Sequence, residues 1–194
     1  MIQDNNHVKL FYSFLDETTL DINVNDLADY CYFVKNNDGG KVLSNVGGWQ
    51  SSNLDVTIPE LRPLITCILE RAENLILEYD LPKTFKIDPI WININEKYHY
   101  NMIHEHPRSL LAGVFYVKAP KDSGDLVFVN PITTMQHYID QTRIEKYNPF
   151  NSYSWAIEPA DNTLVMFPSW VPHFTLPNSS NEDRISIAFN ISER

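Results

Sequence analysis

The sequence RISIAFNI, residues 184–191, alternates between apolar side chains and side chains that are small or polar. Successive side chains of a β-strand project from opposite faces, so this alternation separates the residues into two sets. The two sets are Ile185, Ile187 and Phe189 on one face, and Arg184, Ser186, Ala188 and Asn190 on the other. The pattern predicts either a half-exposed strand or one wall of a barrel with a polar interior.

Further segments upstream have the same period of two and are separated by short polar breaks. They are residues 84–96, 110–118, 125–131, 153–159, 163–170 and 173–177. Residues 7–15 are also β-like. Many short strands in series are typical of a sandwich or a closed barrel rather than of βαβ units. A jelly roll, which holds about eight strands in two sheets, fits this series well.

The first part of the chain has a different, helical period. Apolar residues recur at i, i+3, i+4 and i+7 over residues 61–79, and residues 25–35 form a second, shorter helical segment. We therefore predict a mainly β protein with flanking helices and a jelly-roll or cupin-like core, a double-stranded β-helix. We expect one domain over residues 1–194, with a helical layer at about 1–85 and the β core at about 86–194.

Composition and charge exclude several classes of function. The formal net charge is −10, from 15 basic and 25 acidic residues, and no basic cluster stands out. Binding to nucleic acid relies on cations that neutralise phosphates, so it is disfavoured. Apolar runs are too short to span a membrane, and no leader peptide is evident, so we expect an intracellular protein. Cys31 and Cys67 lack a CxxC partner and are predicted to be free, buried thiols.

The sequence HEHP, residues 104–107, precedes one of the predicted strands and contains two histidines. In extended backbone His104 and His106 point to the same side, whereas Glu105 points away. Pro107 favours extended geometry at His106. Two imidazoles held in this way are a good metal chelate, and His173 at another strand boundary could supply a third donor. An HxH pair can also be two surface residues, and His173 can be an interior histidine.

Arg184 and Ser186 lie side by side on the polar face of residues 184–191. If this face lines a barrel interior, the arginine is a buried cation that needs an anion. A guanidinium offers a fixed bidentate fork for a carboxylate, and the serine hydroxyl could donate a further hydrogen bond.

Together these motifs resemble the 2-oxoglutarate- and Fe(II)-dependent oxygenase superfamily. The closer resemblance is to a bacterial and phage branch with an HxHP…SGVYYV…FPSW…H…RxSxxFN pattern. The chain reads HEHP, AGVFYV, FPSW, His173 and RISIAFN in that order, over about residues 91–191. The resemblance implies a double-stranded β-helix that uses Fe(II), 2-oxoglutarate and dioxygen, and releases succinate and carbon dioxide.

The resemblance also implies roles for individual residues. His104 and His173 match the two histidines of the family's iron site, and Arg184, Ser186 and Tyr116 match residues that hold 2-oxoglutarate. For Tyr116, packing in the core is an equally good interpretation. Phe167 and Trp170 are expected to form walls near the metal. Asn93 and Asn95 could face the site.

The sequence departs from the superfamily at His106, which stands where a carboxylate ligand is usual. We predict three histidine ligands, His104, His106 and His173, with Asp122 and Asp125 as alternative donors. A cupin-like metalloenzyme that does not use 2-oxoglutarate, and a non-catalytic jelly-roll binding module, are the competing interpretations. The substrate would be a peptidyl residue or a small metabolite. Residues 132–150, a helical excursion or a lid, are the expected source of selectivity.

Overall fold

The computed structural model describes residues 13–80, 84–132, 134 and 137–193. Two α-helices lie within this part, α1 Val24–Asn37 and α2 Arg62–Leu77, together with the 3-10 helices η1 Pro59–Leu61 and η3 Gln141–Arg143. The strands are β1 Asp16–Thr19, β2 Asn45–Val46, β3 Trp49–Gln50, β4 Phe85–Asn95, β5 Tyr100–His104, β6 Leu111–Lys118, β7 Leu126–Val129, β8 Ser154–Ile157, β9 Thr163–Pro168, β10 His173–Thr175 and β11 Arg184–Glu193.

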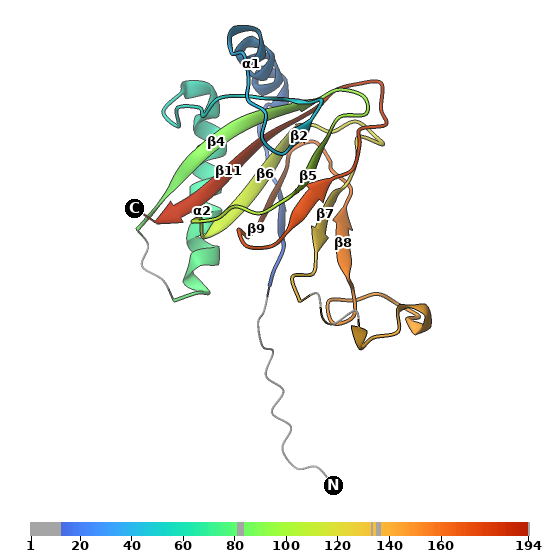
Figure 1. Cartoon of the computed structure of the whole chain (residues 1–194). Helices are drawn as coiled ribbons and strands as arrows, with labels where there is room; N and C mark the ends of the chain where they lie inside the picture. The colour runs from blue at the N-terminus through green and yellow to red at the C-terminus, as the bar shows by residue number, and fades with distance from the viewer. Residues whose placement is uncertain (1–12, 81–83, 133, 135–136, 194) are drawn as a thin grey trace.

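The strands form two antiparallel sheets that face each other (Figure 1). The major sheet has the order β1-β9-β6-β11-β4-β3, and the minor sheet has the order β2-β5-β10-β7-β8. From β4 onward the chain passes repeatedly from one sheet to the other, and only β7 and β8 are consecutive neighbours in the same sheet. This is the double-stranded β-helix, or jelly roll, that the alternating segments predict.

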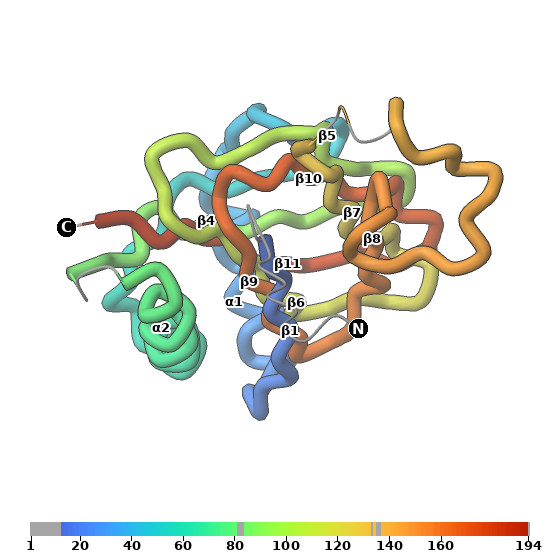
Figure 2. The backbone as a smooth tube through the Cα atoms, turned by 90° about the horizontal axis from the view of Figure 1, so that it is seen from below, coloured from blue at the N-terminus to red at the C-terminus, as the bar shows by residue number. Residues whose placement is uncertain are grey.

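Both α-helices pack on the outer face of the major sheet, away from the minor sheet (Figure 2). One face of each long strand of this sheet is apolar and meets buried residues of α1 and α2. The strand residues in this cluster include Ile90, Ile92 and Ile94 of β4 and Ile185, Ile187 and Phe189 of β11. Burial of such side chains contributes about 1.5–3 kcal/mol each, so this layer supplies much of the stability.

The inner face of the major sheet is different, as the alternation of β11 predicts. It carries Arg184, Ser186 and Ala188 from β11, together with Asn93 and Asn95 from β4, toward the space between the sheets. The strand is therefore the wall of a barrel with a polar interior, and the half-exposed interpretation is wrong. Apolar residues of β6, β7 and β9 fill the rest of this space.

The helices lie close to the predicted segments. α1 begins after an N-cap at Asn23, whose side chain accepts a hydrogen bond from the Asn25 backbone, slightly before the predicted start. α2 ends at Leu77, and Pro63 lies in its first turn, where the missing N–H is tolerated. Cys31 is buried, but Cys67 is only partly buried; both are free thiols.

The chain before residue 62 also supplies three short strands that the sequence pattern did not indicate. β1 adds to the edge of the major sheet beside β9, and β2 and β3 join different sheets beside β5 and β4. Most of the predicted β segment at 7–15 lies outside the described residues. Its described end, residues 13–15, is not part of a strand.

Residues 132–150 connect β7 to β8 beyond the edge of the minor sheet (Figure 2). In the described part of this segment, residues 134 and 137 and the turn η3 have 3-10 geometry, and the rest is irregular backbone, bends and turns. The described residues of this segment contain 3-10 turns and no α-helix, so the helical excursion that the sequence suggested is limited there to 3-10 turns. A search of the described helices for an apolar stretch long enough to cross a membrane finds none.

Candidate active site

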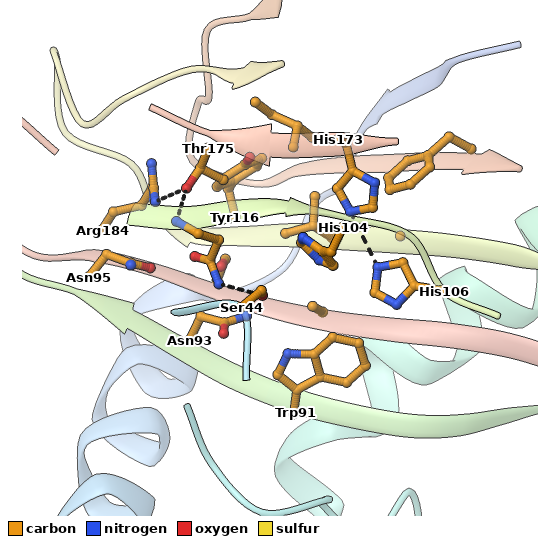
Figure 3. A pocket seen from close by; sticks show the side chains of 17 residues that line it. Ser44, Trp91, Asn93, Asn95, His104, His106, Tyr116, His173, Thr175 and Arg184 are labelled. Carbon is orange, nitrogen blue, oxygen red and sulfur yellow. Dashed lines mark hydrogen bonds between the residues drawn. The ribbon is translucent and has the colours of Figure 1, made fainter. Parts of the chain in front are cut away.

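Three histidines that are separate in sequence converge between the two sheets (Figure 3). His104 ends β5 and lies directly opposite His173, the first residue of β10. His106 follows two residues after the end of β5. One ring nitrogen from each of the three lies within 4.8 Å of the others. In the described part of the chain, no other three His, Cys, Asp or Glu side chains come together in this way.

Backbone carbonyls orient two of these rings. Nδ1 of His104 lies 2.7 Å from the carbonyl oxygen of Met102, and Nδ1 of His173 lies 2.9 Å from that of Val171. A carbonyl oxygen only accepts hydrogen bonds, so each Nδ1 carries the proton and donates it. The lone pair of each ring is then on Nε2. This is the usual way in which proteins fix the tautomer of a metal-binding histidine.

The third ring contacts the second. Nε2 of His106 lies 3.3 Å from Nε2 of His173, and the two rings are nearly parallel. Because His173 presents a lone pair there, a proton on His106 Nε2 bridges the two nitrogens. Two ligands at about 2.1 Å from a metal and at right angles to each other are separated by about 3.0 Å. A metal ion could therefore replace this proton with little movement of either ring.

Burial keeps all three rings neutral. It lowers the pKa of His106 to about 4 and that of His173 to about 3, and it also lowers the pKa of His104. The positive charge that each ring would add near the others acts in the same direction for His106 and His173. Neutral imidazoles keep their lone pairs available at pH 7, which is what metal binding requires.

No carboxylate belongs to this cluster among the described residues. Glu105 is exposed, as its position between the two histidines predicts. Asp122 and Asp125, the alternative donors, are neither members of the cluster nor lining residues of the pocket beside it. The geometry brings together three nitrogen donors and does not support the alternative, in which Asp122 or Asp125 supplies a carboxylate ligand.

At the other end of the same pocket is Arg184, whose side chain is almost wholly buried, with 1% of its surface exposed. Its Nη1 donates to the carbonyl oxygens of Ser123 and Gly124, at 2.6 and 2.8 Å. Its Nη2 donates to Oγ1 of Thr175 at 3.0 Å. None of the ion pairs between described residues includes Arg184, so the buried cation has only neutral oxygen partners.

Ser186 and Tyr116 lie beside this arginine. In the register of the major sheet, Ser186 is opposite Asn93 of β4 on one side and opposite Tyr116 of β6 on the other. All three side chains line the pocket. Burial raises the pKa of Tyr116 to about 12, so its hydroxyl remains a donor. The Oδ1 atom of Asn93 is buried without a hydrogen-bond partner, which indicates that a polar group is missing from this pocket.

Aromatic side chains form the walls on the histidine side. The ring of Phe167 meets His173 edge-on at 4.6 Å between centroids, as expected for a wall residue. Trp91, from β4, lies 5.8 Å from the His106 ring. Trp170 does not serve as a wall: its side chain is 43% exposed and does not line the pocket.

Sequence reasoning missed the residues that support Arg184. Oγ1 of Thr175 accepts a hydrogen bond from Arg184 and another from the backbone N–H of Asn101. The Asn101 side chain in turn donates to Oγ of Ser44 (Figure 3). Thr175 is two residues after His173 and so shares its face of β10, which is a signal that the sequence offered. Asn101 and Ser44 carried no comparable signal, because their place depends on the pairing of β2 with β5.

The donor set fits a divalent metal together with a small dicarboxylate. Three neutral nitrogens at one end of the pocket occupy one side of a metal ion and leave other positions open. The guanidinium at the other end has no anionic partner among the described residues, and it demands one because a buried charge without a counter-charge is costly. A dicarboxylic 2-oxo acid can satisfy both ends.

Comparison with known sequences supports this interpretation. Residues 89–190, just over half of the chain, match the sequence model of the family described as "Putative 2OG-Fe(II) oxygenase". The matched region begins in β4 and ends in β11, so it contains the three histidines and Arg184. No curated protein sequence matches the chain.

Solved structures share the fold at low sequence identity. A prolyl-4-hydroxylase from Pseudomonas putida superposes with a TM-score of 0.65 at 16% identity, covering 93% of this chain and 92% of that one. A viral collagen prolyl hydroxylase from Paramecium bursaria Chlorella virus-1, in complex with 2-oxoglutarate, gives 0.60 at 12%, covering 91% and 94%. HygX from Streptomyces hygroscopicus, with nickel, 2-oxoglutarate and hygromycin B bound, gives 0.61 at 8%, covering 93% and 83%.

The family match and the shared fold agree with the convergence of the histidines and with the buried arginine at the far end of the pocket. Fe(II) and 2-oxoglutarate are the cofactor and cosubstrate that this family implies. The chain belongs to the 2-oxoglutarate- and Fe(II)-dependent oxygenases.

Proposed function

We propose that the chain binds Fe(II) through Nε2 of His104, His106 and His173, and 2-oxoglutarate through Arg184, and that it oxidises a C–H bond of a peptidyl residue or a small metabolite. The observation that carries this proposal is the buried guanidinium of Arg184. It shares a pocket with three convergent imidazoles and has no anionic partner among the described residues. When bound, iron and 2-oxoglutarate together supply the activation of dioxygen, with succinate and carbon dioxide as coproducts.

The protein groups would hold the cosubstrate at its far end. The guanidinium of Arg184 is already fixed by Ser123, Gly124 and Thr175, so it presents its remaining N–H groups in a defined direction. A charge-assisted pair with a carboxylate then costs little ordering entropy. The hydroxyls of Ser186 and Tyr116 lie in the same cross-strand row and can each donate to that carboxylate.

The aromatic walls would control water. Phe167 covers one side of His173, and Trp91 lies beside His106. Apolar rings at these positions keep water away from the metal-binding nitrogens and strengthen the electrostatic interactions inside the pocket. The chain's own residues therefore contribute positioning and exclusion of solvent, while the reaction with oxygen belongs to the metal and cosubstrate.

A metalloenzyme of the cupin type that does not use 2-oxoglutarate would need the histidines alone. It gives no reason for a buried arginine without a counter-charge at the far end of the pocket. A binding module with structural histidines would need neither metal nor anion. Arg184 therefore favours the oxygenase over both alternatives.

Anaerobic titration of the protein with Fe(II) and 2-oxoglutarate tests the proposal. The complex is expected to give a weak visible charge-transfer band. Arg184→Ala is expected to raise the Kd for 2-oxoglutarate by about 10- to 100-fold, which corresponds to a charged hydrogen bond of about 1.5–3 kcal/mol. Arg184→Lys, which keeps the charge but not the fork, should lie between the two.

Arg62→Ala is the matched control, because Arg62 is exposed at the start of α2 and does not line the pocket. Its Kd for 2-oxoglutarate should equal that of the wild-type protein. The proposal fails if no band forms, or if the band persists in Arg184→Ala at limiting 2-oxoglutarate.

A further inference from the structure

A row of side chains crosses the minor sheet from the histidine cluster to the outermost strand. His104, His173, Phe128 and Trp155 lie directly opposite one another in β5, β10, β7 and β8. Directly opposed residues project from the same face of a sheet, so Trp155 points to the side on which the histidines converge. Phe128 is buried and its ring contacts Phe167, whereas Trp155 is 47% exposed. The row therefore leads from the candidate metal site to the surface.

The outer edge of β8 offers unpaired backbone groups. Tyr153 and Asn130 are opposite each other, and the Asn130 N–H donates to the Tyr153 carbonyl. Because bonded and non-bonded pairs alternate in an antiparallel ladder, Trp155 bonds to β7, and Ser154 and Ala156 face away from it. Both residues are exposed, and no hydrogen bond of their backbone groups occurs within the described ranges.

β8 also lacks the features that usually protect an edge strand. Its sequence, SWAI, has no charge and no proline, whereas β1, at one edge of the major sheet, reads DETT. Natural proteins protect exposed edges with charges, prolines or bulges, because an unprotected edge pairs readily with another chain. An uncharged edge that carries a half-exposed tryptophan is therefore suited to binding.

A groove adjoins this edge. It is lined by β8, by the residues just before it, and by Gln141 and Tyr147 of the segment that connects β7 to β8. Its volume is about 610 Å³, against about 60 Å³ for the pocket that holds the histidines and Arg184. Three half-exposed aromatic side chains, Tyr147, Tyr153 and Trp155, line the groove. The groove is the larger of the two spaces, so it can hold a part of the substrate that lies outside the inner pocket.

We propose that the edge of β8 binds an extended segment of a polypeptide substrate as an additional strand, with one large apolar side chain against Trp155. This rests on the proposed function and specifies its substrate class. Backbone pairing at Ser154 and Ala156 supplies affinity, and the aromatic groove selects side chains, as in other cases of strand addition. The net charge of −10 favours a neutral or basic segment over an acidic one.

The register also limits how far, along the substrate chain, the oxidised residue lies from the segment that pairs with β8. Strands are about 4.8 Å apart, so a peptide paired with β8 lies three spacings, or about 14 Å, from His173. An extended chain advances about 3.3 Å per residue, so about four residues span this distance. The paired segment is therefore not the oxidised one. It lies at least about four residues away in the substrate sequence.

Peptide selection tests the proposal without knowledge of the natural substrate. A phage-displayed library of random 12-residue peptides is selected on the full chain, and synthetic copies are titrated, first without metal and then anaerobically with Fe(II) and 2-oxoglutarate. Ala156→Pro removes one outward N–H and leaves the bonds of Trp155 and Ile157 to β7 intact, because proline is tolerated where an edge N–H faces solvent. It is expected to weaken binding at least tenfold.

Ala156→Thr is the matched control, because threonine keeps the backbone N–H and favours a strand. The affinity of this variant for the selected peptides should stay within about twofold of that of the wild-type protein. Amide hydrogen exchange on the wild-type protein gives a second measurement. Bound peptide should slow exchange at Ser154 and Ala156 at least tenfold, and leave it unchanged at Glu17 on the edge of β1.

Three results overturn the proposal: no peptide is selected, selected peptides bind Ala156→Pro as tightly as wild type, or exchange at Ser154 and Ala156 is unaffected. Binding of only small molecules in the groove gives the first of these results. Each is independent of the Fe(II) and 2-oxoglutarate band, so loss of that band would contradict the proposed function and leave peptide binding to be judged separately.

Discussion

At the residue scale, the histidines of the HEHP sequence have different surroundings from the glutamate between them. His106 points inward and lies 3.3 Å from His173, whereas Glu105 is exposed. The strand period alone separates these side chains, so this part of the candidate site could be predicted from the sequence. The sequence also favours His106 as the third donor, but it does not exclude Asp122 and Asp125, because the place of their turn in three dimensions is not visible in the pattern.

This contrast gives a prediction for Fe(II) affinity. His106→Ala removes one of three nitrogen donors and should raise the Kd for Fe(II) by more than about 100-fold, since loss of a merely supporting group near a metal already costs 10–100-fold. Anaerobic calorimetry measures the Kd. Glu105→Ala is the control in the same turn and should change it less than twofold. Equal effects of the two changes would show that His106 is not a ligand.

At the scale of single elements, β6 and β11 illustrate what a sequence pattern specifies and what it omits. The alternation of β11 predicts both of its faces correctly, because one face meets helices and the other meets a polar cavity. The sequence does not reveal why β6 contains Gly113. In the structure Gly113 lies opposite Phe189, and a Cβ atom added to it would be 2.3 Å from the Phe189 ring.

Gly113→Ala should therefore lower the free energy of unfolding by about 1–3 kcal/mol, the usual cost of overpacking a core. Urea denaturation measures it. Gly39→Ala is the control, because nothing lies within 4 Å of a Cβ atom at Gly39, and it should change the free energy by less than about 0.5 kcal/mol. Unchanged stability of Gly113→Ala would mean that the Phe189 ring moves aside freely.

The short strands β1, β2 and β3 show the limit of pattern recognition. Two of them contain only two residues each, which is too short for any period to be visible. The position of β1 follows from pairing with β9, that of β2 from pairing with β5 and that of β3 from pairing with β4, all strands far away in sequence. The part that Asn101 plays in supporting Arg184, through its hydrogen bond to Thr175, is beyond sequence reasoning for the same reason.

At the scale of the whole molecule, the reactivities of the two cysteine thiols can distinguish local opening of the structure from global unfolding. Cys31, on the inner side of α1, is fully buried, and burial raises the pKa of its thiol to about 12. Cys67 is partly exposed, and burial and the nearby Glu70 raise its pKa as well. The thiolate is the reactive form, so a raised pKa means slower reaction at a given pH.

Thiol labelling of the native protein at pH 8 should therefore give one slow reaction, at Cys67, whose rate rises with pH up to its pKa. Cys31 should react only at the rate of global unfolding. Mass spectrometry after timed labelling identifies each site, and Cys67→Ser should abolish the early reaction. Labelling of native Cys31 as fast as Cys67 would contradict the burial of α1 against the sheet.

The division of the major sheet into two faces has an evolutionary consequence. Along β4, β6, β9 and β11, residues of one parity hold the helices and residues of the other parity line the interior. A mutation on the inner face can alter binding or catalysis in the pocket while the packing between the sheet and the helices stays intact. Such a scaffold can accumulate many substitutions, and its substrate can change, while each successive variant still folds.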